Sequence, residues 1–150
     1  MNATLPQGPT PVPDVTSSTT ATVTPTMVHM ALKVTLDSST GTVSISGPGY
    51  QNGTISVDTD YCLIVFTAET QAGQQPVVFP TNPIDWVSGT GIPIPPPSPF
   101  AVQRNNDIQI TILDCNNMKS PTPFPFTISV FSGGKTFTSS DPTILNKPPA

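Results

Sequence analysis

The most prominent feature of the hydrophobic pattern is one continuous apolar run, Tyr61-Cys-Leu-Ile-Val-Phe66. Such a run offers apolar side chains to both faces of a strand, so it predicts a central strand that is covered on both sides. By alternation, Cys62, Ile64 and Phe66 form one face, and Tyr61, Leu63 and Val65 form the other. Two packed sheets bury only one face of each sheet. We therefore expect the second face to be covered, either by the 76–99 segment or by another subunit.

Elsewhere, apolar and polar residues alternate. Val28 to Leu36 alternates over nine positions, and Val43 and Ile45 resume the pattern after a turn at 37–41, which predicts a hairpin. Later patterns predict a short strand at 55–57 and two more hairpins, which turn at Asn105-Asn106 and at Ser132–Gly134. No segment has a helical period. The pattern predicts an all-β fold, an antiparallel immunoglobulin-like β-sandwich of about 7–9 short strands.

Proline marks the segments outside this pattern. Residues 1–26 are rich in Pro, Thr and Ser, and we expect a disordered tail or an arm that orders against a neighbouring subunit. Residues 27–145 form the predicted β-sandwich domain, and 146–150 a C-terminal tail. Residues 80–99 hold seven prolines, which predicts a long excursion without a regular ladder, pinned by Trp86. Its Pro93–Pro99 part has PxxP spacing but is more typical of a rigid connector.

Charge is scarce in this chain. Charged residues make up 9%, against about 25% in typical soluble domains, and the net charge is −4. The five basic residues are scattered, so we expect neither nucleic acid nor an anionic membrane surface as a partner. No signal-peptide pattern is visible at the N-terminus, and we expect a cytoplasmic protein.

The residues that usually carry catalysis are few. His29 is the only His and lies on the polar phase of its strand, Glu69 is the only Glu, and no Ser lies in a Gly-x-Ser-x-Gly elbow. We therefore predict that the protein is not an enzyme and has no cofactor or metal. The alternative is a Ca²⁺ site at one end of the sandwich, made by four turn aspartates: Asp58, Asp60, Asp107 and Asp114.

The two cysteines invite a disulfide, but strand parity argues against one. Cys62 shares a phase with Ile64 and Phe66, whereas Cys115 lies opposite the phase of Ile110 and Ile112. A cytoplasmic chain would also keep both thiols reduced. We expect two free thiols.

A protein with this inventory most plainly works by binding. We predict a non-catalytic protein that acts by protein–protein binding or assembly, as a homo-oligomer. The alternative is a module for a carbohydrate-like ligand that uses Trp86 and nearby polar groups. Four aromatic residues are the candidate contacts in either case: Tyr50, Tyr61, Phe79 and Trp86.

The C-terminal quarter carries a family resemblance. A strand, Gly133-Gly134 and a second strand are followed by Phe137-Thr-Ser-Ser-Asp-Pro-Thr-Ile-Leu-Asn146. This ending resembles that of the DP-EP family, small prokaryotic proteins of unknown function, and is similar to the ending of bacterial inclusion-body proteins. Asp141-Pro142 would be the first signature dipeptide, and the chain has no Glu-Pro. The resemblance implies a β-sandwich and no active site.

Overall fold

The computed structural model describes residues 27–149, so the predicted N-terminal tail, 1–26, lies outside the described residues. In the described part all regular structure is β. The strands are β2 (Met27–Asp37), β3 (Thr42–Ser46), β4 (Tyr50–Gln51), β5 (Thr54–Val57), β6 (Tyr61–Glu69), β7 (Ile84–Trp86), β8 (Phe100–Asn106), β9 (Gln109–Cys115), β10 (Thr122–Ser132), β11 (Lys135–Thr138) and β12 (Thr143–Asn146). The all-β prediction is confirmed.

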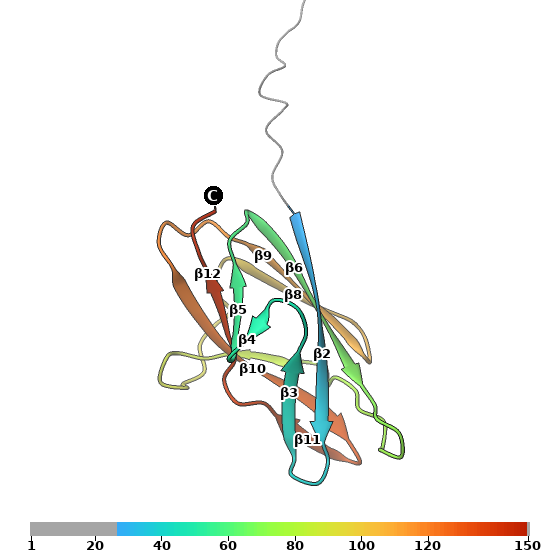
Figure 1. The fold of residues 1–150 in the computed structure, drawn as a ribbon. Helices are drawn as coiled ribbons and strands as arrows, with labels where there is room; N and C mark the ends of the chain where they lie inside the picture. The colour runs from blue at the N-terminus through green and yellow to red at the C-terminus, as the bar shows by residue number, and fades with distance from the viewer. Residues whose placement is uncertain (1–26, 150) are drawn as a thin grey trace, which may run out of the picture.

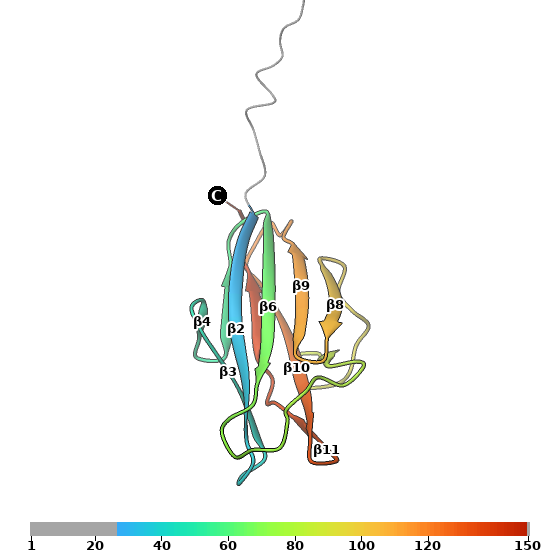
Figure 2. The same ribbon diagram turned by 90° about the vertical axis from the view of Figure 1, so that its right-hand side faces the viewer.

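These strands form two sheets that pack against each other (Figures 1 and 2). The five-stranded sheet has the order β3-β2-β6-β9-β8, and the six-stranded sheet has the order β11-β10-β12-β5-β4, with β7 paired to β10. As the apolar run predicted, β6 is the central strand of its sheet. Figure 1 shows that β2 begins and β12 ends at the same end of the molecule.

The prediction that all strands pair antiparallel was wrong at two places. β2 runs parallel to β6 over nine residue pairs, and β5 runs parallel to β12 over four. Both sheets are therefore mixed. Alternation predicts a strand and its buried face, but it does not say which other strand lies beside it.

The core is built where the inward phases of the two sheets meet. Phe66 of β6 contacts Phe126 of β10 edge-on, with ring centroids 6.1 Å apart, and Trp86 lies 5.7 Å from Phe126. All three side chains are buried. The inward residues of β2 and β9, such as Leu32 and Ile112, complete the layer.

The second predicted hairpin turns later than expected. β8 continues through Asn106, and the turn is formed by Asp107-Ile108, with a bulge between Arg104 and Asn106. The Asn106 side chain accepts a bond from the Ile108 amide at 2.9 Å, which supports the tight turn. Ile108 is consequently 47% exposed, instead of sharing the buried phase of Ile110.

The excursion at 76–99 contains more regular structure than its prolines predicted. β7 pairs with β10 at 84–86, and Val78 forms an isolated bridge with Phe131. Val77, Phe79 and Trp86 insert their side chains into the core. The excursion is thus an edge of the six-stranded sheet, because its prolines fall beside these short pairings and leave the required N–H groups free to bond.

Candidate functional site

Trp86 is placed in the core rather than on a binding surface. Its side chain is 4% exposed, and its ring stacks on Phe100 with centroids 4.5 Å apart and an interplanar angle of 19°. One edge of Trp86 borders a surface groove of about 260 Å³ between β7, β8 and the loop that precedes β7. A ring in this position supports β8 against the excursion and does not offer an open face to a sugar.

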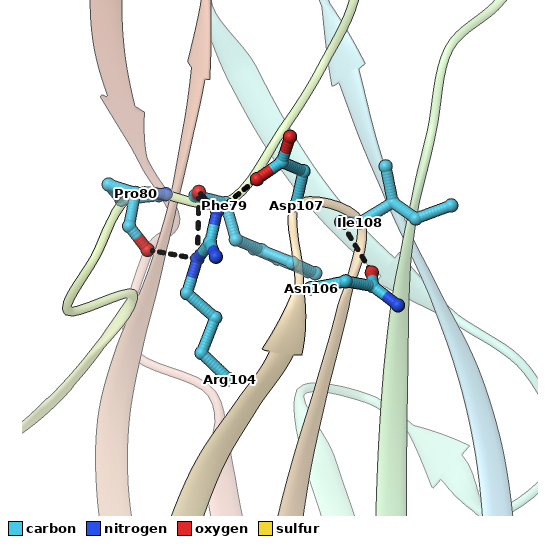
Figure 3. A network of polar contacts seen from close by, with 6 residues as sticks. All are labelled: Phe79, Pro80, Arg104, Asn106, Asp107 and Ile108. Atoms are coloured by element: carbon cyan, nitrogen blue, oxygen red, sulfur yellow. Dashed lines mark hydrogen bonds and ion pairs between the residues drawn. The ribbon is translucent and has the colours of Figure 1, made fainter.

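Arg104 forms the wall of the same groove and fastens the excursion to β8 (Figure 3). Its guanidinium donates to the backbone oxygens of Phe79 and Pro80, and Nη2 also lies 2.7 Å from Asp107 Oδ1. The Phe79 amide in turn donates to the Asp107 carbonyl at 2.7 Å. Because these bonds use most of the donors of Arg104, we interpret the network as structural: it holds the excursion against β8.

The four aromatic residues predicted as contacts do not converge. Phe79 is 1% exposed and belongs to the core, like Trp86. Tyr50 is half-buried in β4 and borders two surface depressions, one around the β4–β5 turn and one between β3 and the 139–142 segment. Tyr61 is half-buried at the start of β6, beside a depression shared with Cys115 and Asn116. They therefore mark two core positions and two separate surface positions.

The outer face of the five-stranded sheet carries a band of apolar side chains, which we call the outer band. It consists of Tyr61, Leu63 and Val65 of β6, Leu113 of β9, and Ala31 of β2. The sheet register places Leu63 directly opposite Leu113, and Val65 opposite Ala31. The β6 and β9 members are only half-buried. Figure 2 looks onto this face, where β2, β6, β9 and β8 lie in front of the other sheet.

The expectation that the 76–99 segment covers this face was wrong. The segment pairs with β10 and contacts the end of β8, so it closes one side of the core. Within the described residues, the outer band is incompletely covered: its β6 and β9 members are half-buried, and Ala31 is exposed. Since β6 alternates between buried and half-buried positions, the two faces of the apolar run have different roles.

A buried polar pair lies at the end of the core where β6 begins and β9 ends. Asp114 of β9 and Asn146 of β12 are both 0% exposed, and Asn146 Nδ2 donates to Asp114 Oδ1 at 2.9 Å. Asp114 Oδ2 and Asn146 Oδ1 are buried without a hydrogen-bond partner. Burial raises the pKa of Asp114 to about 6, while the bond from Asn146 opposes that rise. The pair joins the two sheets.

Cys62 is the third polar group at this place, opposite Asp114 in the register. Its side chain is 0% exposed. Burial, followed by the nearby carboxylates of Asp114 and Asp58, raises the pKa of the Cys62 thiol to about 12. Both cysteines are free thiols, with Cys62 buried and Cys115 exposed, as parity predicted.

The four aspartates of the calcium hypothesis are not brought together. Asp107 and Asp114 lie at opposite ends of β9, about 23 Å apart for a seven-residue strand. Within residues 27–149, no group of three or more His, Cys, Asp or Glu residues is placed to hold a metal ion. His29 is exposed on the outer face of β2, which is the position its polar phase predicted.

The Asp114–Asn146 pair was not predicted as a site, although half of its signal was present in the sequence. Asp114 continues the phase of Ile110 and Ile112, which places its carboxyl group in the core. Asn146 carries no such signal, because it stands in a four-residue strand that follows Asp-Pro.

No protein-family model matches the chain, and no match was found among curated proteins. The described residues include no helix that is long and apolar enough to cross a membrane.

Proposed function

We propose that this protein is non-catalytic and acts by protein–protein binding, with a second copy of itself as the partner on the outer band. The observation that carries the proposal is the incompletely buried pair Leu63–Leu113 near the centre of a five-stranded sheet face. Contiguous apolar surface on the middle of a sheet is uncommon in a monomer and typical of an interface.

The outer band lies where charge opposes a second copy least. The chain carries a net charge of −4, so two copies repel each other over most of their surface. On the outer face, Lys33 of β2 and Glu69 of β6 lie 3.3 Å apart and neutralise each other beyond Val65. In the middle of the face, two copies can therefore meet without bringing like charges together.

The size of the face also suits a self-associating sheet. Five strands spaced about 4.8 Å apart, with about seven residues of about 3.3 Å each, cover roughly 24 by 23 Å. This plan area of roughly 550 Å² is below the roughly 800 Å² per partner of a standard-size interface, so the face matches the small, weak end of specific interfaces. In face-to-face packing about a two-fold axis, the outer band of one copy would contact the outer band of the other copy.

The sugar-binding alternative has weaker support. It needs an aromatic ring open to a ligand, and Trp86 stacks on Phe100 with 4% of its surface exposed. We also propose that the two sheets form an immunoglobulin-like sandwich and that the chain is related to the DP-EP family, as its C-terminal motif suggests. Both proposals imply a scaffold for binding.

The self-association is tested by changing the two leucines to an oppositely charged pair, Leu63→Glu with Leu113→Lys. Opposite charges across a strand pair are tolerated in the monomer, but burying them in an interface costs free energy. We expect the unchanged protein to form dimers or larger species in analytical ultracentrifugation at about 1–100 µM, the concentrations at which an interface worth roughly 6–8 kcal/mol becomes populated, and the double variant to stay monomeric.

The matched control is Ile92→Asp, which removes a 62% exposed isoleucine on the excursion, away from the outer band. It should associate as the unchanged protein does. A protein that remains monomeric over the whole concentration range, or a double variant that still associates, would contradict the proposal. If the protein is a monomer and its outer band binds a different protein, the partner is that protein and not a second copy.

A further inference from the structure

The two orphaned oxygens of Asp114 and Asn146 need a physical explanation, because buried polar atoms without partners are rare in native structures. Asp114 Oδ1 already accepts from Asn146 Nδ2, so the two side chains face each other. What remains is one oxygen on each, Asp114 Oδ2 and Asn146 Oδ1, both buried. Two acceptors cannot bond to each other, but an acid and an acceptor can.

We propose that Asp114 and Asn146 form a proton-operated lock between the two sheets. One proton on Asp114 Oδ2 is donated to Asn146 Oδ1, and with the existing Nδ2–Oδ1 bond it closes a two-bond ring between a carboxylic acid and an amide. When the proton leaves to solvent, the second bond is lost, and an anion remains buried. The lock goes beyond the proposed self-association and does not depend on it.

The surroundings of Asp114 support the neutral acid. The neighbour on β6 is the Cys62 thiol, and the nearest position on β8 is Phe100, so neither adjacent strand places a cation opposite it. Asp58, before β6, adds a negative charge close to Cys62. The ion pairs within the described residues involve Lys33 and Arg104 but not Asp114. A buried carboxylate without a cation is expected to take up a proton near neutral pH.

The position of the lock determines what it controls. Among residues 27–149, this pair makes the only side-chain to side-chain hydrogen bond between the two sheets. It fixes the end of β12, next to the Lys147 amide that donates to Val57. Opening the lock should therefore loosen β12 at the end of the molecule where β2 begins.

The sign of the pH dependence follows from the direction of the shift. The folded pKa of Asp114, about 6, lies above its ordinary value of 3.8, so the native state binds this proton more tightly than the unfolded chain. The stabilisation is complete below about pH 4 and is lost as the pH rises to about 6. Because the folded and unfolded pKa values of Asp114 differ by about two units, the equilibrium constant for unfolding should rise by about 100-fold over this pH range.

The test compares unfolding by urea from pH 4 to 7.5 for the unchanged protein and for Asp114→Asn. The variant can form the same two-bond ring with Asn146, amide to amide, at every pH. We expect no difference in stability at pH 4, and a variant about 100-fold more stable at pH 7. The control Asp85→Asn, at an exposed position of β7, should leave the pH dependence unchanged.

A second measurement keeps the test decisive if Asp114→Asn does not fold. The carboxyl ¹³C resonance of Asp114 should titrate close to pH 6 in the unchanged protein. The protection factor of the Lys147 amide, which compares its exchange rate with that of the unfolded chain at the same pH, should fall above that pH. A titration near pH 4, or a stability difference that is independent of pH, would overturn the lock. A rise in stability with added CaCl₂ that Asp114→Asn abolishes would overturn it in favour of a cation site.

Discussion

At the scale of the residue, side-chain parity was the most reliable guide in this chain. It placed Cys62 in the core and Cys115 outside, and the structure confirms both positions. The same reasoning places Asp114 inside, but a polar residue on a buried phase is easily interpreted as the end of a strand. What no pattern could provide is the partner, because Asn146 comes from a strand 32 residues away. The site therefore could be predicted only in part.

The two thiols give a prediction at this scale. Burial and nearby carboxylates raise the pKa of Cys62 to about 12, so its reactive thiolate is scarce at neutral pH as well as inaccessible. Ellman's reagent should label one thiol per folded chain at pH 8 and two in denaturant. Cys115→Ser should leave no thiol that reacts rapidly in the folded protein. Rapid labelling of that variant would show that the core around Cys62 opens easily.

At the scale of the element, the strands with clear alternation were predicted, and so were the short β5 and β11, but β4, β7 and β12 were not. The hairpin of β2 and β3 follows its pattern, with the Asp37 carboxylate accepting from Ser39 in the turn. β12 was missed because it has only four residues, of which Ile144 is the one large buried aliphatic, and so short a segment shows no clear alternation. The apolar run of β6 indicated two covered faces, yet the described part of the chain covers one.

Gly47 provides the prediction for an element. It follows β3 with φ of +137°, and a Cβ there would lie 2.9 Å from Leu32 Cδ2 and 3.0 Å from the Ala31 oxygen. Neither atom can retreat, since Leu32 is buried and the oxygen belongs to β2. Gly47→Ala should lower the free energy of unfolding by about 1–3 kcal/mol, measured by urea denaturation.

Gly89→Ala is the matched control, because a Cβ at Gly89 meets nothing within 4 Å. Its stability should stay within about 1 kcal/mol of the unchanged protein. Equal losses in the two variants would mean that the close approach at Gly47 does not limit stability.

At the scale of the whole molecule, the neighbours of each strand could not be predicted from the sequence. Parallel pairing of β5 with β12 requires that the last strand of the chain lie between β10 and β5. Its inward residues, Ile144 and Asn146, are both 0% exposed. A turn or an edge strand would be dispensable, but a strand with a neighbour on each side is not.

Truncation tests this placement. A chain that ends at Pro142 lacks β12 and should give the poorly dispersed amide spectrum of an unfolded protein. A chain that ends at Lys147 keeps every strand and should remain folded. A folded spectrum from the shorter chain would show that β5 and β10 can close the sheet without β12.

The same strand order sets a time at which the protein can fold during synthesis. β4 and β5 are made early, yet their sheet gains its central strand only when residues 143–146 have left the ribosome. Contacts between residues so far apart in sequence form slowly, since a long loop must close before they stabilise the chain. Until then β5 has an open edge, and such edges promote aggregation of nascent chains. Folding of the six-stranded sheet should therefore be limited by the insertion of β12 between β10 and β5.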